Sequence, residues 1–392
     1  MKQIQPHVPT VTYDHRDEDS CVDPWPRWRQ MRQDQPLVYS DAYNGFYALS
    51  RYQDVIEAAR NTDAFSSGLD GTTIPTFPTP KLPPLHADPP DARQWRMIIN
   101  PHFSPAAVAR YEPWIRELAG QVVAPLLASD KFDVPRDLGL PLTRRVILRI
   151  MGVAMAPPEL NEWSDDMVYG VGERAEAGSA RVMGFLAEEI KRRRTSPDEG
   201  LISAMFGQRL GSCDRVLNDE EILRLMVLVL VAALETTSSV VSSAVAYLVD
   251  NPRAVERLRN EPDIWPKAMD EFVRWASPAA AMARTVRYDA EVAGCPIPAG
   301  SKMLLLFGSA NHDEQEFPDP DDVVLDRSPN RHIGFGMGPH RCLGSHLAKC
   351  QIAATLERLL PALGDWRIED ATKITWTASV TRGMTALPLI RR

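Results

Sequence analysis

The chain is poor in cysteine and has no paired cysteine framework. Its 392 residues include five scattered cysteines, Cys21, Cys213, Cys295, Cys342 and Cys350. Small secreted folds that depend on disulfides carry many cysteines at paired spacings, so this class is excluded. Unpaired thiols are typical of a reducing compartment, and we expect a cytoplasmic protein.

Long apolar runs are also absent. The longest contains MVLVLVAAL at 226–234 and, with Leu225, has 10 residues, whereas a membrane-spanning helix needs about 20. The N-terminal stretch MKQIQPHVPTVTYDHRDEDS is polar and lacks the apolar core of a signal peptide. We therefore expect residues 226–234 to belong to a buried core helix and the protein to have no membrane partner.

The chain also carries no excess of positive charge. The formal net charge is −8, which argues against a nucleic-acid partner. There is no internal repeat and no long low-complexity linker. With 44% hydrophobic and 24% charged residues, the composition is that of an ordinary globular protein, long enough to enclose a bulky ligand. We expect a single domain over residues 1–392.

Proline and hydrophobic spacing divide the chain into short elements. The 33 prolines mark breaks, and the segment 73–90 is too rich in proline for a helix or strand interior, so it is predicted to be a long loop. Apolar residues three and four apart predict helices at 106–128, 181–194, 218–250, 253–260, 266–276 and 344–360. Short apolar stretches predict strands at 46–50, 291–294, 301–307 and 385–390. The prediction is mainly α with a small β region, the β-rich parts lying roughly at 30–65, 285–310 and 370–392.

One cysteine stands in an unusual setting. Cys342 lies in the stretch HIGFGMGPHRCLGSHLAK (332–349), with four glycines around it and a predicted helix after it. It could be a buried structural thiol, since free cysteine packs as a small hydrophobe. It could bind zinc with His346 and Cys350, which follow at four-residue spacing. It could also be an axial thiolate to haem iron, because a helix N-terminus stabilises the thiolate and glycine lets backbone approach a flat macrocycle.

The third interpretation is supported by a resemblance. FGMGPHRCLG resembles the haem-binding loop of the cytochrome P450 family, whose pattern F-G-x-G-x-H-x-C-x-G is matched in full. The resemblance covers most of the chain and includes some likeness to the camphor-hydroxylating type. It implies the cytochrome P450 fold, with haem b between the long central helix and the helix after the cysteine loop. It also implies that Cys342 is the metal ligand and that the loop contacts the cofactor through Phe335, Gly336 and Gly344.

Three further stretches extend the resemblance. The Glu271-x-x-Arg274 pair is similar to the family's Glu-x-x-Arg, whose buried charges bind a downstream arginine, here Arg327. This charge lock is structural, and its loss should abolish haem incorporation. The Val323-Val324 pair stands where the family more often has Phe-Asp.

In the long helix, Ala232-Ala233-Leu234-Glu235-Thr236 is similar to the family's small-residue, acid, threonine pattern. The resemblance implies that Thr236 holds dioxygen through a hydrogen bond and that Glu235 relays protons. On the residues alone, the hydroxyls in this helix could instead bond back to carbonyls four residues earlier. Ala233 replaces a common glycine, which should reduce helix distortion.

The third stretch concerns the haem carboxylates. DPPDARQWR (88–96) resembles the family's D-P-P-x-H-x-x-x-R, with Arg96 at the arginine and Ala92 where histidine is usual. Arg284 and His340 match the other two donors. Arginine–carboxylate contacts are charge-assisted and often bidentate.

The resemblance implies a monooxygenase that inserts one atom of O2 into a small hydrophobic substrate, by hydroxylation or O-dealkylation of a terpenoid or simple aromatic. The chain shows no flavin or iron–sulfur motif, so electrons should come from a ferredoxin and its ferredoxin reductase, for which Arg341 and Lys349 are candidate docking cations. Arg382 could point into the substrate pocket or away from it. The predicted pocket residues are Leu228, Ala232, Ala233, Ala280, Ala281, Met282, Val380 and Thr381, together with the 73–85 loop.

Two other functions compete. A haem sensor or carrier without turnover would not need the Glu235–Thr236 pair. A peroxide-driven peroxygenase usually replaces that pair, so its presence argues against this function as well.

Overall fold

The computed structural model describes residues 8–76, 80–170, 172–211, 215–377 and 381–392. Within them the fold is mainly helical with small sheets, which confirms the predicted fold class. The helices are α1 Glu18–Val22, α2 Trp25–Asp34, α3 Tyr52–Arg60, α4 Asp91–Phe103, α5 Pro105–Leu127, α6 Leu140–Met151, α7 Leu160–Tyr169, α8 Glu173–Thr195, α9 Leu201–Ala204, α10 Asp219–Asp250, α11 Pro252–Asn260, α12 Trp265–Ala276, α13 Phe307–Ala310 and α14 Ser345–Leu359.

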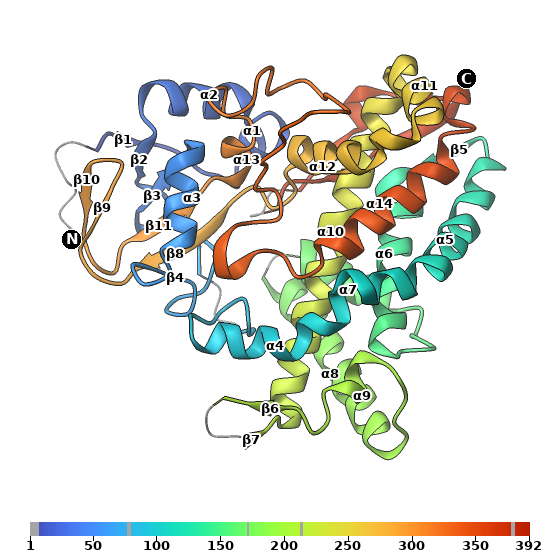
Figure 1. The fold of residues 1–392 in the computed structure, drawn as a ribbon, viewed down its shortest axis with the longest axis horizontal. Coiled ribbons are helices and arrows are strands. Elements are labelled where there is room, and N and C mark those ends of the chain that lie inside the picture. The colour runs from blue at the N-terminus through green and yellow to red at the C-terminus, as the bar shows by residue number, and fades with distance from the viewer. Residues whose placement is uncertain (1–7, 77–79, 171, 212–214, 378–380) are drawn as a thin grey trace.

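The largest sheet joins strands from the N-terminal part of the chain with two strands from residues 282–305. It has six strands in the order β1-β2-β3-β11-β8-β4, with β1–β2 and β3–β11 parallel and the other pairs antiparallel. Its strands are β1 Thr10–Val11, β2 Leu37–Ser40, β3 Phe46–Leu49, β4 Phe65–Ser66, β8 Met282–Val286 and β11 Lys302–Leu305. Figure 1 shows this sheet and α3 at one end of the molecule, with most helices at the other.

The remaining strands form four small sheets. Three are hairpins, made by β6 Arg209–Leu210 with β7 Arg215–Val216, β9 Ala290–Val292 with β10 Cys295–Ile297, and β13 Thr375–Trp376 with β14 Met384–Ala386. The fourth has the order β12-β15-β5 and comprises β5 Lys131–Asp133, β12 Trp366–Ile368 and β15 Pro388–Arg391.

The predicted β-rich part at 30–65 is wrong over its second half. Residues 52–60 form α3, because Tyr52, Val55, Ile56 and Ala59 recur at helical spacing and are all buried. The β-branched Val55 and Ile56 beside strand β3 obscured that helical period. The predicted helix 181–194 is also longer in the structure, since α8 begins at Glu173.

Helix α10 is the central element. Asn218 caps it by accepting a hydrogen bond from the Glu221 backbone N–H, and the Glu221 carboxylate accepts one from the Asn218 N–H in return. Its most apolar window has a mean hydropathy of 1.9, which by length and composition suffices to cross a membrane. However, 72% of that window is buried inside the protein, and α10 packs against α6, α8, α12 and α14 (Figure 1). It is therefore a core helix, as the sequence predicts.

Candidate functional site

The glycines before Cys342 are required by the shape of the loop. The Gly336 N–H donates to Ile333 O at 2.8 Å and the Cys342 N–H donates to Phe335 O at 2.7 Å, so the chain folds back on itself before α14. Gly336 and Gly338 have φ angles of +68° and +66°. This left-handed region is costly for residues with a Cβ, so glycine is needed at both turns.

Gly338 also allows close packing against α3. A Cβ at this position would lie 3.0 Å from the Ala59 carbonyl oxygen and 3.3 Å from the Arg60 Cα. Both are backbone atoms of α3 that cannot yield by a side-chain rotation. The N-terminal helix α3 and the C-terminal cysteine loop are thereby held together.

Many protein atoms lie around the Cys342 thiol, but the cysteine side chain is not fully covered by them. Many atoms enclose it, and this burial raises the pKa of the thiol, while the Gly344 backbone N–H, Arg341 and Arg96 act in the opposite direction. The side chain nevertheless keeps accessible surface. A structural thiol would be in contact on all sides, so the geometry does not fit that interpretation.

A zinc site is not formed either. Within the described part of the chain, no three His, Cys, Asp or Glu side chains gather closely enough to hold a metal ion. Cys342, His346 and Cys350 are all described, so their regular spacing does not bring the three side chains together. A single thiolate ligand, with the remaining bonds supplied by a cofactor, is what the geometry allows.

Two arginines and a histidine, Arg96, Arg284 and His340, lie near the cysteine loop. The His340 pKa is lowered to about 4 by burial and by the charges of Arg284 and Arg96. Burial also lowers the pKa of Arg284 to about 10. His340 Nε2 and Arg284 Nε are buried and have no hydrogen-bond partner among the described residues. Two buried donors in a positive environment fit an anionic group such as the carboxylates of haem.

The other contacts of this cluster are to backbone. Arg96 donates to Arg341 O at 2.7 Å, which joins α4 to the cysteine loop, and Arg284 donates to Ala283 O at 2.8 Å. Ala92, which stands where the resemblance calls for histidine, is fully buried and offers no donor.

Asp88 is the counter-charge nearest to this cluster. Its negative charge acts on both Arg284 and His340. The carboxylate accepts hydrogen bonds from the Ser66 hydroxyl at 2.5 Å and the Ser67 N–H at 2.8 Å, and it pairs with Arg287. Because Asp88 already has these partners, it leaves Arg96, Arg284 and the neutral His340 available to an added anion.

Glu271, Arg274 and Arg327 form one buried ion-pair network. The Glu271 and Arg274 side chains are fully buried and make two parallel hydrogen bonds of 2.8 Å. Arg327 Nε lies 3.0 Å from Glu271 Oε2. Burial alone would raise the pKa of Glu271, but the Arg274 hydrogen bonds and charge outweigh it, and the pKa is lowered.

Backbone groups complete the network, and no sequence motif indicates them. Arg274 donates to carbonyl oxygens of Asn311, Pro320 and Asp322, and Arg327 to those of Pro318, Asp319 and Asp322. The irregular segment after α13 is held by these bonds. The Val324 N–H donates to Glu271 Oε1 at 2.8 Å. Because this contact uses backbone, valine serves as well as aspartate there.

One face of α10 keeps accessible surface although the helix lies in the core. Leu228, Ala232, Ala233 and Thr236 are partly or largely accessible, whereas Leu230 and Leu234 are buried. Positions 228, 232 and 236 are four apart and lie on one side of the helix. We call these four residues the accessible face. The helix is continuous through Ala233, in line with the expected reduction of distortion.

The acid and the threonine of α10 point to different partners. Thr236 Oγ1 donates to Ala232 O at 3.0 Å, which is the backbone contact that the residues alone suggested. Glu235 is buried, and its Oε2 accepts a 2.8 Å hydrogen bond from Thr381 Oγ1. Burial raises the pKa of Glu235 to about 7, although Thr381 and Thr377 oppose the rise. The carboxyl can therefore take up and release a proton near neutral pH.

The other predicted pocket residues divide into three groups. Met282 and Thr381 keep some accessible surface. Ala280 and Ala281 are buried in a hydrophobic cluster with Tyr13 and Trp28, so they pack in the core. Val380 lies outside the described residues, as does part of the 73–85 loop.

Arg382 points away from the accessible face. Its guanidinium donates to the carbonyl oxygens of Cys21 and Val22 at 2.9 and 3.0 Å. It also lies 4.0 Å from the Trp376 ring centroid and 4.8 Å from that of Trp25. The charge is thus used to join the C-terminal hairpin to α1.

The two candidate docking cations differ in their surroundings. Lys349 pairs with Asp270 at 3.0 Å, so its charge is offset, while Arg341 is exposed.

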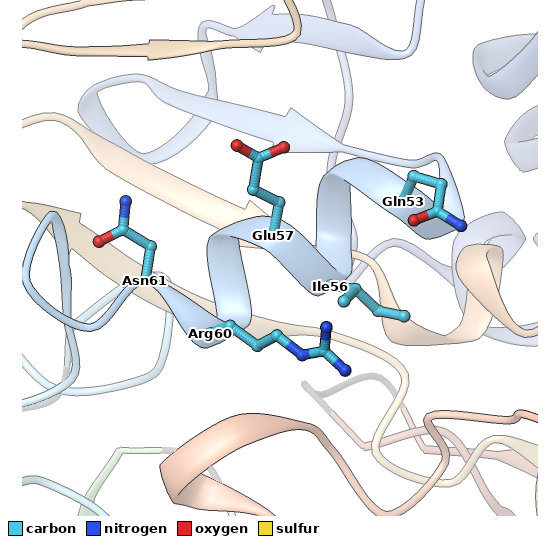
Figure 2. Close-up of a pocket in the computed structure, with 5 residues that line it drawn as sticks. All are labelled: Gln53, Ile56, Glu57, Arg60 and Asn61. Atoms are coloured by element: carbon cyan, nitrogen blue, oxygen red, sulfur yellow. The ribbon is translucent and has the colours of Figure 1, made fainter.

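A hollow of about 450 Å³ lies on α3 and is lined by Gln53, Ile56, Glu57, Arg60 and Asn61 (Figure 2). It contains none of the predicted site residues, so it is separate from the candidate site.

Comparisons with known proteins give one family. The family model described as Cytochrome P450 matches residues 171–363. A steroid C26-monooxygenase of Mycolicibacterium smegmatis is 32% identical over 93% of this chain and 91% of its own length. A beta-dihydromenaquinone-9 omega-hydroxylase of Mycobacterium bovis is 33% identical over 96% of this chain and 77% of its own length.

The fold agrees with these matches. The structure of cytochrome P450 CYP109Q5 from Chondromyces apiculatus superposes with a TM-score of 0.85 at 29% identity, covering 97% of this chain and 98% of that one. Members of this family carry iron protoporphyrin bound through a cysteine thiolate. The chain belongs to the cytochrome P450 family and is a haem-thiolate monooxygenase.

Proposed function

We propose that Cys342 supplies the axial thiolate and that Arg96, Arg284 and His340 bind the haem carboxylates. The observation that carries this assignment is the pair of buried, unpartnered donors, His340 Nε2 and Arg284 Nε, beside a loop whose thiol is enclosed but accessible. Phe335, Gly336 and Gly344 belong to the same loop and would lie against the cofactor. The iron's positive charge would keep the Cys342 sulfur deprotonated despite its burial.

When bound, the haem activates O2, and the overall reaction converts substrate, O2, two electrons and two protons into hydroxylated substrate and water. The residues of the chain deliver protons and position the substrate. Thr236 lies on the accessible face, where its hydroxyl would be able to donate a hydrogen bond toward the cofactor side by turning away from Ala232 O. Glu235 is next to it and exchanges protons near neutral pH.

The substrate is proposed to be an uncharged hydrophobic molecule, with a terpenoid as the first choice and a simple aromatic as the second. The accessible face offers Leu228, Ala232 and Ala233, which are apolar. Arg382, whose direction the sequence left open, donates to backbone at α1. The steroid and menaquinone hydroxylases among the relatives are named for isoprenoid-derived substrates, which supports the terpenoid choice.

Electrons are proposed to come from a ferredoxin and its reductase, in the cytoplasm. Arg341 is exposed next to Cys342 and is a suitable contact for an acidic partner. Lys349 is less suitable, because Asp270 already pairs with it.

A spectrum tests the haem assignment. The reduced protein with carbon monoxide should show the long-wavelength Soret band of thiolate ligation. Cys342→Ala should lose this band and most of the pigment, whereas the control Cys350→Ser, on the following helix α14, should keep both. An unchanged spectrum for Cys342→Ala would refute the assignment.

Turnover separates the competing functions. With ferredoxin, reductase and a terpenoid, NADH consumption should depend on the substrate and yield an oxygenated product. A sensor or carrier would bind haem without product. A peroxygenase would form product with hydrogen peroxide in place of NADH and ferredoxin.

A further inference from the structure

The C-terminal hairpin is docked on α10 next to Glu235 through Thr381 and Gly383. Gly383 has no room for a side chain, because a Cβ there would collide with the Ser239 hydroxyl one helical turn after Glu235. On the far side, the Arg382 N–H donates to Pro278 O at 2.7 Å. The backbone that follows Thr381 is thus fixed at Arg382 and Gly383, and this places Thr381 against α10.

Thr381 and Glu235 form a polar contact in which the Glu235 carboxyl is buried. Thr381 Oγ1 donates to Glu235 Oε2 at 2.8 Å, and Thr377 lies against the same carboxyl. Glu235 Oε1 is buried with no partner among the described residues. One oxygen is therefore held by the hairpin, and the other is left available to a proton donor or acceptor.

We propose that Thr381 is a positioning residue that holds the Glu235 carboxyl in the orientation used for proton delivery. The expected effect on turnover rests on the proposed function. The contact between Thr381 and Glu235 is made by the protein alone and does not depend on haem. A residue of the C-terminal hairpin, 146 positions away in sequence, thereby controls the acid of the central helix.

Apart from burial, the Thr381 and Thr377 hydroxyls are the main influence on the pKa of Glu235. Burial raises the pKa of Glu235 and the Thr381 and Thr377 hydroxyls lower it, with no contribution from a charged side chain on any described element packed against α10. Arg382, the next residue, directs its charge to Cys21 and Val22. A hydrogen bond to the ionised carboxylate stabilises it, so removing this bond should raise the pKa further.

The test is an infrared titration of the purified holoprotein. The carbonyl band of protonated Glu235 is identified by its loss in Glu235→Gln, and its midpoint in the unaltered protein should lie at about pH 7. Thr381→Val should raise the midpoint by about one to two pH units. Thr381→Ser keeps the hydroxyl and should restore the original midpoint. The pH profile of substrate turnover should move in the same direction.

Thr385→Val is the matched control. Thr385 lies on the same hairpin, and its hydroxyl bonds to Thr375 at 2.7 Å rather than to α10, so its loss should leave the midpoint unchanged. If Thr381→Val is unstable, Thr377→Val gives a smaller upward shift by the same reasoning. An unchanged midpoint in Thr381→Val, an equal shift in Thr385→Val, or no band sensitive to Glu235→Gln would overturn the proposal. Failure of the proposed function would appear separately, as a missing thiolate Soret band.

Discussion

At the scale of single residues, the chemistry of the site depends on a few atoms whose surroundings are unusual. His340 Nε2, Arg284 Nε and one Glu235 oxygen are buried without a hydrogen-bond partner among the described residues. Such groups are expensive in a folded protein unless a ligand or a reaction uses them. The first two lie beside the cysteine loop and the third is on α10, where a bound anion and a proton transfer could use them.

Gly338 offers a test at this scale. Gly338→Ala should lower the free energy of unfolding by about 1–3 kcal/mol, because the left-handed φ disfavours alanine and the new Cβ would press on Ala59 O. The haem content should fall with it. The control Gly184→Ala, at an exposed α8 position with open space around it, should instead stabilise by about 0.5–1 kcal/mol. Chemical unfolding of both variants measures the difference, and equal effects would contradict it.

At the scale of elements, long-range contacts fix the segments that carry no regular structure. The segment after α13 is held by carbonyl groups bonded to Arg274 and Arg327, both of which are anchored on Glu271. This segment leads directly into the cysteine loop. The charge lock on α12 thus sets the position from which the loop starts, although none of its atoms takes part in catalysis.

Breaking the lock should therefore unfold the cysteine loop. Glu271→Ala leaves two buried arginines without their carboxylate, and we expect a loss of about 3–5 kcal/mol in the free energy of unfolding together with loss of bound haem. Arg257→Ala is the control, since that arginine forms surface pairs with Glu261 and Asp326. Its loss should amount to less than about 1 kcal/mol. Comparable destabilisation in the two variants would show that burial of the lock is unimportant.

At the scale of the whole molecule, the net charge of −8 opposes an acidic electron donor. Binding of the ferredoxin that we propose as electron donor would therefore depend on local positive charge near the cysteine loop. We also propose that residues 1–392 form one domain, because strands from the first 66 residues share a sheet with strands from 282–305.

The partner surface can be tested by charge reversal. Arg341→Glu should raise the ferredoxin concentration needed for half-maximal turnover several-fold at low salt, and added salt should reduce the difference between variant and unaltered protein. Arg253→Glu, an exposed position on α11, changes the net charge equally and should have little effect. Steady-state kinetics at two ionic strengths decide between a local surface and a general charge effect.

The sequence by itself determined the fold class, the α10 and α14 helices, and the grouping of residues into a cysteine loop, a charge lock and an acid–threonine pair. These depend on local periodicity and on short motifs whose spacing is visible along the chain. Only the tertiary structure decided which side chains and backbone groups contact one another. It showed that Glu235 is held by Thr381, that Arg382 turns toward α1, that Ala280 and Ala281 pack in the core, and that backbone carbonyls complete the lock. These contacts join segments far apart in sequence, and their geometry follows from how the elements pack, which no local pattern records.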